Sequence, residues 1–216
     1  AIPDGRREAA NRRFDAHGAT LIAELHGLYG QRADFSAWLV ELCRHLGALA
    51  EARPPALAEL DAKREERPDW FVRQRMLGYS TYVDRFGGTL AGVGTRIHHL
   101  AALGVDYLHL LPFLRARRGD SDGGFAVASF DEVDPAYGSM ADLDALTTQL
   151  REAGISLCSD LVLNHVAADH AWARAAVAGD ADKRAFFHVF ADRAKAEAYE
   201  ATLGEAFPQA APGNIT

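Results

Sequence analysis

Apolar residues recur at helical spacing through the first third of the chain. In residues 7–28 they return every three or four positions, and a second such stretch runs from Asp34, an N-cap type of residue, to Leu49. Pro54 and Pro55 end the second stretch, because proline has no backbone N–H and disfavours helix at the residue before it. The charged residues 56–66 follow. This pattern predicts three helices.

The hydrophobic pattern changes at about Gly78. Short runs of aliphatic, aromatic and β-branched residues predict three strands, at residues 79–83, 105–111 and 155–163. Two helical patterns separate them, at residues 90–103 and 140–153, each followed by a glycine that can end a helix. The second run is almost entirely apolar, which is typical of a strand buried on both faces. The alternation predicts a parallel α/β sheet with right-handed crossovers.

Chain length limits this interpretation. A complete (β/α)₈ barrel takes roughly 250 residues, and the part of the chain after Gly78 has room for about four of its eight units. Only three strands are recognisable. The predicted fold class is therefore α/β: a partial (β/α)₈ TIM barrel, comprising the first three β/α units, preceded by an all-helical N-terminal domain. The chain also begins without methionine, so we expect it to be a piece of a longer protein.

Composition narrows the classes of function. The chain has 216 residues, 49% of them hydrophobic, and a formal net charge of -7. An acidic chain makes nucleic acid an unfavourable partner, because phosphate binding needs clustered cations. There is no apolar run of about 18 residues for a membrane span, and the N-terminus lacks a signal-peptide core. Two cysteines form no metal or disulfide motif. We expect a cytoplasmic protein with no metal, no cofactor and no membrane partner.

Polar residues lie at the end of the third predicted strand or just beyond it, where the chemistry of a barrel lies. Asp160 and Asn164-His165 end an otherwise apolar run. Asp160 and His165 are five positions apart, so they share a pocket only if the strand ends before His165. The alternative is a buried aspartate paired with an internal arginine, and a histidine that caps the strand.

The loop after the second predicted strand contains Ser121-Asp122-Gly123-Gly124-Phe125. Two glycines allow the backbone to approach a ligand closely or to adopt positive φ. Asp122 supplies a hydrogen-bond acceptor and Phe125 a stacking face, which suits a sugar ring. The alternative is an ordinary Asp-Gly turn.

Together these motifs resemble the α-amylase superfamily of glycoside hydrolases and transglycosidases, whose first signature region is similar to Asp160-x-x-x-Asn164-His165. Several other segments resemble the amylosucrase branch of that superfamily: residues 82–86, 107–112, 121–127, 190–193 and 199–208. The resemblance implies an enzyme that takes the glucosyl unit from sucrose, releases fructose and extends an α-1,4-glucan with retention. Its partners would be small carbohydrates, namely sucrose and a glucan acceptor.

The resemblance also implies roles for individual residues. Asp122 would contact the glucosyl hydroxyls at the bottom of the pocket. Phe125, where the family commonly has tyrosine, would stack beneath the ring. His165 would hydrogen-bond the primary hydroxyl, and Asp160 and Asn164 would support the site.

Retaining chemistry needs two carboxyl groups about 5–5.5 Å apart. In this superfamily the catalytic carboxylates follow the fourth, fifth and seventh strands, so we expect none of them in this chain. They would lie beyond Thr216, and the isolated chain would be inactive. The implied domains are a helical N-terminal domain (1–77), the first part of the barrel (78–165) and the start of an inserted domain (166–216).

Four alternatives stay open from the sequence. A sucrose hydrolase, or another glucosidase of the superfamily, would use the same pocket with water as acceptor. A chain that binds sugar without catalysis, or a non-catalytic structural remnant, belongs to a different class.

Overall fold

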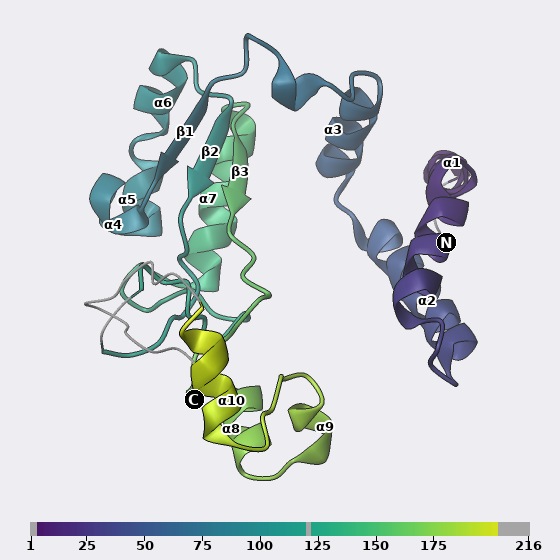
Figure 1. Ribbon diagram of the computed structural model, residues 1–216. Helices are drawn as coiled ribbons and strands as arrows, with labels where there is room; N and C mark the ends of the chain where they lie inside the picture. Colours follow the sequence, from purple (N-terminus) through teal and green to yellow (C-terminus); the bar gives the residue numbers. More distant parts are fainter. Residues whose placement is uncertain (1–3, 120–121, 203–216) are drawn as a thin grey trace. The chain divides into compact units, whose positions relative to one another are not determined.

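The computed structural model describes residues 4–119 and 122–202 (Figure 1). Ser121 and residues 203–216, the end of the predicted inserted domain, lie outside the described residues. The chain divides into two compact units, Ala1–Phe71 and Val72–Thr216. None of the described helices has the length and apolarity needed to cross a bilayer.

The first unit is helical, as the periodicity predicts. Its elements are α1 (Asp4–Tyr29), α2 (Phe35–Ala52), α3 (Pro55–Glu65) and the start of a 3₁₀ turn, η1 (Trp70–Val72). Asp34 is the N-cap residue of α2, but its side chain does not cap the helix. The Asp34 carboxylate instead accepts two hydrogen bonds from Arg32, of 2.9 and 2.8 Å, and these lower the pKa of Asp34. That the unit is a domain of its own stays a prediction.

The second unit contains a parallel sheet, which confirms the α/β prediction. Its strands are β1 (Gly78–Thr81), β2 (Tyr107–Leu110) and β3 (Ser156–Ser159), in the order β1-β2-β3. The helices are α4 (Val83–Phe86), α5 (Leu90–Gly94), α6 (Ile97–Leu103), α7 (Met140–Glu152), α8 (Ala171–Val177), α9 (Ala181–Arg184) and α10 (Arg193–Glu200). The register aligns Ser80, His109 and Cys158 across the three strands.

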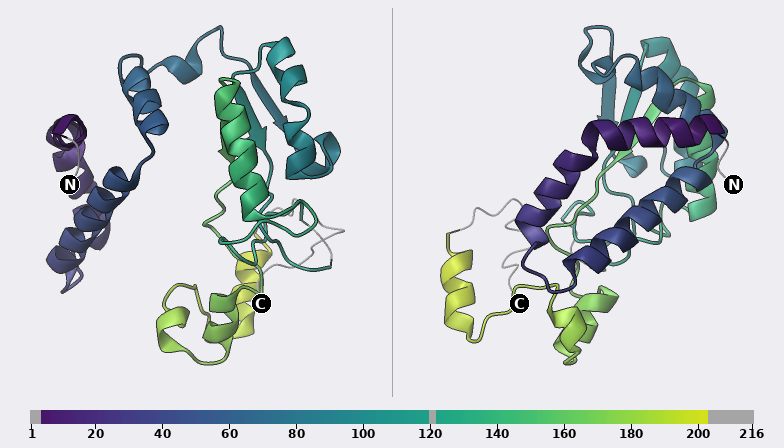
Figure 2. Two further views of the ribbon diagram at one scale, coloured as in Figure 1. Left: turned by 180° about the vertical axis from the view of Figure 1, so that it is seen from behind. Right: turned by 90° about the vertical axis from the view of Figure 1, so that its right-hand side faces the viewer.

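One face of the sheet carries the core of this unit. Leu108 and Leu110 of β2 are fully buried against apolar side chains of the flanking helices, which are Leu90, Val93, Leu100, Leu146 and Leu150. Figure 2 shows α7 running along this side of the strands. At roughly 1.5–3 kcal/mol for each large aliphatic side chain buried, this layer dominates the stability of the unit.

The prediction that the second strand is buried on both faces is wrong for the part of the chain described. Tyr107 and His109 alternate with the two leucines and are only half-buried. The helices that pack on the strands cover the leucine side, and the other side carries polar residues. The sequence did not show this alternation clearly, because Tyr107 and His109 alternate with leucines in a run that is mostly apolar.

Three predicted boundaries also need correction. The third strand ends at Ser159 instead of residue 163, and Val83 belongs to α4 instead of the first strand. The helix predicted over residues 90–103 is split into α5 and α6 around Arg96. The predicted glycine stops are confirmed: Gly104 and Gly154 have φ of 80° and 76°, a region that residues with a Cβ disfavour.

Candidate functional site

The loops that follow β1, β2 and β3 leave the same edge of the sheet, because the three strands are parallel. Tyr82 follows β1, Asp122 and Phe125 lie in the long loop after β2, and Asp160 directly follows β3. This edge therefore carries three residues that the sequence singles out, Asp122, Phe125 and Asp160, although Asp122 and Asp160 are 38 positions apart in the chain.

The loop after β2 folds back on itself. Two isolated antiparallel bridges, Leu114 with Val133 and Ala116 with Val127, pair its outgoing and returning halves. At the tip, the Asp122 carboxylate accepts a hydrogen bond from the backbone N–H of Ala126 at 3.1 Å. This bond uses one oxygen of Asp122, and residues 122–124 form a bend.

The glycine pair is required by geometry. Gly123 and Gly124 have φ of 84° and 88°, the left-handed region that favours glycine. A Cβ on Gly123 would lie 2.8 Å from the Tyr82 hydroxyl, and one on Gly124 would lie 3.1 Å from the carbonyl oxygen of Pro112. Gly123 therefore lies against the Tyr82 side chain from the loop after β1, and Gly124 packs on Pro112 within the loop after β2.

A pocket of about 360 Å³ opens beside this contact. Its lining combines two tyrosines, two aspartates, two arginines and loop backbone: Tyr82, Asp84, Arg85, Pro112, Leu114, Ala116, Arg117, Gly123, Gly124, Asp134 and Tyr137. Burial raises the pKa of Tyr137, and the nearby charges of Asp84 and Asp134 raise it further. The phenol is therefore a hydrogen-bond donor throughout the neutral range.

Asp160 lies where the regular strand has ended. Its Oδ2 is 3.3 Å from Nε2 of His109 on β2, and the other ring nitrogen of His109, Nδ1, is 3.1 Å from the Ser80 hydroxyl on β1. The predicted alternative, a buried aspartate paired with an internal arginine, is wrong in its partner: the described partner is a histidine. A polar chain thus crosses all three strands.

A backbone hydrogen bond joins the two loops that carry the predicted sugar-binding residues. Ala167 N–H donates to the carbonyl of Val127 at 2.9 Å, and Ala126, Ala128 and Ala167 form a small buried cluster around it. Phe125 and His165 each lie two residues from this bond. Their loops are therefore adjacent at the edge of the sheet.

Asn164 and His165 are both exposed in the described structure, in a segment without regular secondary structure. The strand has ended before His165, which is the condition for Asp160 and His165 to share a pocket. That Asp122, Phe125 and His165 contact one sugar ring stays a prediction, as do the supporting roles of Asp160 and Asn164.

The helix that follows the segment after β3 begins with a histidine cap. The N-cap of α8 is His170, whose Nδ1 accepts from the N–H of Trp172 at 3.2 Å. The His170 ring is buried and lies edge-on to Phe130, with ring centroids 5.8 Å apart. This contact attaches the segment after β3 to the loop after β2 a second time.

Sequence reasoning missed His109, Ser80 and Tyr82 as members of this site. The available signal was polarity: His109 is a polar side chain between two leucines of the second apolar run. In the part of the chain that the structure describes, no three His, Cys, Asp or Glu side chains gather as they would around a metal ion.

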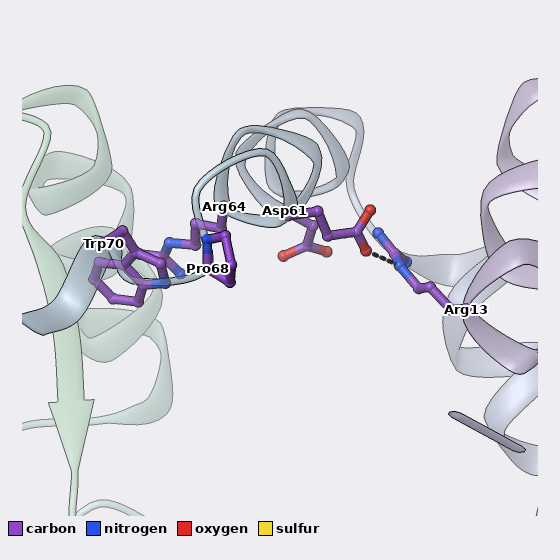
Figure 3. A pocket seen from close by; sticks show the side chains of 6 residues that line it. Arg13, Asp61, Arg64, Pro68 and Trp70 are labelled. Atoms are coloured by element: carbon purple, nitrogen blue, oxygen red, sulfur yellow. Dashed lines mark hydrogen bonds and ion pairs between the residues drawn. The ribbon is translucent and has the colours of Figure 1, made fainter. Parts of the chain in front are cut away.

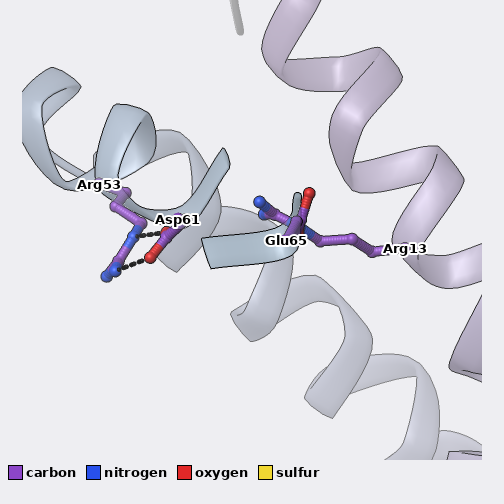
Figure 4. A network of polar contacts seen from close by, with 4 residues as sticks. All are labelled: Arg13, Arg53, Asp61 and Glu65. Carbon is purple, nitrogen blue, oxygen red and sulfur yellow. Dashed lines mark hydrogen bonds and ion pairs between the residues drawn. The ribbon is translucent and has the colours of Figure 1, made fainter. Parts of the chain in front are cut away.

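A second pocket, of about 430 Å³, lies on the helical unit (Figure 3). Its charged side chains engage one another or an aromatic ring: Arg13 pairs with Glu65, and the Arg64 guanidinium lies 3.9 Å from the Trp70 ring centroid. Beside it, Arg53 holds Asp61 by two hydrogen bonds (Figure 4), which lower the pKa of that carboxyl. None of the five predicted site residues lines this groove or the pocket beside Tyr82.

Comparison with known proteins gives a family match over most of the chain. The family described as "Alpha amylase, catalytic domain" matches residues 38–211. Trehalose-6-phosphate hydrolase of Escherichia coli K12 is 38% identical over 100 residues, which are 46% of this chain and 18% of the hydrolase. An α-glucosidase of Culex pipiens is 32% identical over 139 residues, 61% of this chain and 22% of the glucosidase.

Among solved structures, trehalulose synthase MutB from Pseudomonas mesoacidophila MX-45 is similar at 26% identity over 47% of this chain and 19% of the synthase, with a TM-score of 0.43. The matched part of the chain spans about a fifth of the length of each of these relatives.

Proposed function

The chain belongs to the α-amylase catalytic-domain family, and from this premise we propose that it supplies the glucosyl-binding part of an enzyme that processes α-glucosides with retention. Asp122, Phe125 and His165 hold the glucosyl ring. Asp160 and Asn164 support the loop that carries His165. Residues 1–77 form a helical domain, 78–165 begin the barrel and 166–216 begin an inserted domain.

The observation that carries the proposal is the hydrogen bond from Ala167 N–H to the Val127 carbonyl. It brings the loop of Asp122 and Phe125 beside the segment of His165 at one edge of the sheet. A site for one ring needs both loops, since neither alone offers a stacking face, a carboxylate and an imidazole.

The three side chains have complementary chemistry for a pyranose. A carboxylate accepts hydrogen bonds from neighbouring hydroxyls, and one oxygen of Asp122 is already oriented by the backbone N–H of Ala126. The Phe125 ring offers an apolar face to the C–H groups of the sugar. An imidazole donates to or accepts from the primary hydroxyl.

The reacting carboxylates come from residues outside this chain. Asp122 and Asp160 are engaged by the Ala126 backbone and by His109, roles that suit binding and support. The nucleophile and the acid/base follow Thr216 in our proposal, and the chain of 216 residues does not turn over substrate by itself.

For the substrate we propose sucrose, with release of fructose and extension of an α-1,4-glucan. The support is the amylosucrase-like sequence around the site, residues 82–86 and 121–127. Water as acceptor, giving a sucrose hydrolase, uses the same pocket.

A second candidate is an α-glucosidase that does not use sucrose. It is favoured by the curated relatives, which include the trehalose-6-phosphate hydrolase and the α-glucosidase described above. Both candidate enzymes would bind the glucosyl unit in the same site, and they differ in the leaving group that is attached to it in the substrate.

The test uses a polypeptide that continues past Thr216, incubated separately with sucrose, maltose and trehalose 6-phosphate. Fructose release with an iodine-staining polymer supports the first candidate, and glucose from sucrose without polymer identifies a hydrolase. Turnover of maltose or trehalose 6-phosphate alone selects the second candidate.

Variants then test the site itself. Asp122→Asn keeps the size of the side chain but removes its charge, and we expect kcat/KM to fall at least about 100-fold, the order seen when one such polar contact is lost. No turnover of any α-glucoside by a folded polypeptide contradicts the proposal and leaves the non-catalytic alternatives. Calorimetric titration of the 216-residue chain with glucose then tests binding without catalysis.

A further inference from the structure

The side of the sheet away from the leucine core carries a continuous polar chain. Ser80 on β1 and His109 on β2 are register partners, and Asp160 continues the alternation of Ser156 and Cys158 along β3. The two hydrogen-bond distances, 3.1 Å from Ser80 Oγ to His109 Nδ1 and 3.3 Å from His109 Nε2 to Asp160 Oδ2, span the whole sheet. The His109 and Asp160 side chains are 31% and 25% exposed.

The chain of contacts fixes the orientation and the tautomer of His109. When the imidazole is neutral, Nε2–H donates to the Asp160 carboxylate, which only accepts, and Nδ1 accepts from the Ser80 hydroxyl. When the imidazole is protonated, Nδ1–H donates to the same hydroxyl. Ser80 therefore satisfies His109 in both charge states, and Nε2–H faces Asp160 in both.

Asp160 is the first residue after β3, and it begins a segment of eight residues, 160–167, without regular secondary structure. Leu161 and Leu163 in this segment are 68% and 75% exposed, so packing does little to hold it. It is attached at its start by Asp160 to His109 and at its end by Ala167 to Val127. His165 lies between the two attachments.

We propose that His109 is a positioning residue: through Asp160 it fixes the first attachment of the segment that presents His165. Val127 fixes the second attachment, beside Phe125. The role of this positioning in sugar binding rests on the proposed function. The attachment of Asp160 to His109 does not depend on that function.

Two amide substitutions separate the two hydrogen bonds of His109. In His109→Gln the side-chain amide nitrogen reaches the position of Nε2 and still donates to Asp160. In His109→Asn the shorter amide reaches only the position of Nδ1, beside Ser80, and the contact with Asp160 is lost. Both variants remove the imidazole, so a general effect on folding appears in both.

The first measurement uses the chain of 216 residues. Hydrogen exchange of the Ala167 amide, which donates to Val127, should be about tenfold faster in His109→Asn than in the natural chain, and within about twofold of it in His109→Gln. Exchange at Leu108 and Leu110 should match between the two variants. Equal exchange of the Ala167 amide in both variants overturns the proposal.

The second measurement reads the tautomer. Long-range ¹H–¹⁵N spectra of the neutral imidazole should place the proton of His109 on Nε2, and this preference should weaken in Asp160→Asn. A proton on Nδ1 in the natural chain contradicts the proposed direction of the hydrogen bonds.

The third measurement uses the polypeptide extended past Thr216. There His109→Asn should raise KM for the glucosyl donor about tenfold, with little change in kcat, and His109→Gln should restore most of the loss. If the exchange and tautomer results hold but neither variant changes KM, the attachment is real and its role in sugar binding is rejected. If no α-glucoside is turned over, the proposed function fails while the first two measurements still decide the attachment.

Discussion

The two units of the chain differ in the interactions that stabilise each of them internally. In the α/β unit, leucines and valines from strands and helices form a closed core, and Leu90, Leu100 and Leu108 have no exposed surface. In the helical unit, no apolar side chain with described burial is fully buried. Phe14 and Leu49 remain 53% and 55% exposed, and exposed ion pairs and edge-on aromatic contacts join the helices.

The difference in core packing affects how firmly each unit can position the side chains of a binding site. Close-packed apolar side chains hold the helices and strands around them in one arrangement, because a void or an extra methylene in the core costs folding free energy. Exposed ion pairs contribute about 0–1 kcal/mol each and leave side chains free to rearrange. The predicted sugar-binding residues lie in loops that follow strands of the closed core. The groove on the helical unit is instead lined by side chains in exposed ion pairs.

The largest expected effect comes from truncating the core. Leu108→Ala removes a fully buried side chain between the sheet and its helices, and we expect the free energy of unfolding of the α/β unit to fall by about 2–5 kcal/mol. Denaturant unfolding followed by the fluorescence of Trp172, which lies in this unit, measures the loss.

The matched control is Leu49→Ala in the helical unit, where the side chain is 55% exposed. The expected change is within about 0.5 kcal/mol, since no cavity is created. Trp38 on the same helix reports it. Losses of similar size in the two units would contradict the comparison.

A somewhat smaller effect is expected at the glycine pair. Gly124→Ala places a Cβ at a φ of 88° and 3.1 Å from the Pro112 carbonyl oxygen. The left-handed backbone costs roughly 1–2 kcal/mol and the crowding adds to it, so the loss should reach about 2–4 kcal/mol.

Gly119→Ala separates the two contributions. Its φ is 86°, nearly that of Gly124, but a Cβ there meets no atom within 4 Å. The loss should be limited to the backbone term, about 1–2 kcal/mol. Equal losses in the two alanine variants would show that the packing of Gly124 on Pro112 within the loop after β2 is loose.

A third effect, of about 1 kcal/mol, is expected from a helix cap. Ser139 and Asp142 form a reciprocal capping box at the start of α7, and Ser139→Ala should destabilise the α/β unit by about that amount. Asp34, the N-cap of α2, makes no capping bond, so Asp34→Ala should change the helical unit less.

The pH dependence of this cap has a definite sign. Hydrogen bonds from the side chain and backbone of Ser139 lower the pKa of Asp142. Its contribution is therefore present above the carboxyl pKa of the unfolded chain and is lost as pH falls through the folded value. The stability difference between the natural chain and Ser139→Ala should shrink on acidification, and a constant difference would contradict the mechanism.

Much of the fold was accessible from the sequence because it depends on local patterns. Helical periodicity placed α1, α2, α3 and α7, and Gly104 and Gly154 ended helices where only positive φ fits. The length of β3 was not accessible, because a strand ends where its pairing partner ends. The role of His109 was not accessible either, since its contact with Asp160 joins residues 51 positions apart through a register that no local pattern specifies.

The candidate site was predictable in part for the same reason. Asp122 and Phe125 flank a glycine pair, which is a local signal with a physical cause, and both loops leave the predicted edge of the sheet. Their adjacency depends on the bond from Ala167 to Val127. Backbone groups carry no sequence signature, so this contact emerges only from the structure.

The smallest expected effect concerns the ion pair of Arg53 and Asp61 on the helical unit, whose side chains are 42% and 24% exposed. Asp61→Asn should lower the stability of this unit by less than about 1 kcal/mol, and the loss should shrink in 1 M salt. Hydrogen bonds from Arg53 lower the pKa of Asp61, so the contribution is present above the unfolded carboxyl pKa and disappears as pH falls through the folded value. Unfolding followed at Trp38 and Trp70 at pH 7 and pH 3 measures it: the natural chain and the variant should converge at the lower pH. A loss that matches Leu108→Ala, or one that salt leaves unchanged, would mean that this pair is part of a closed core, and the contrast between the two units would fail.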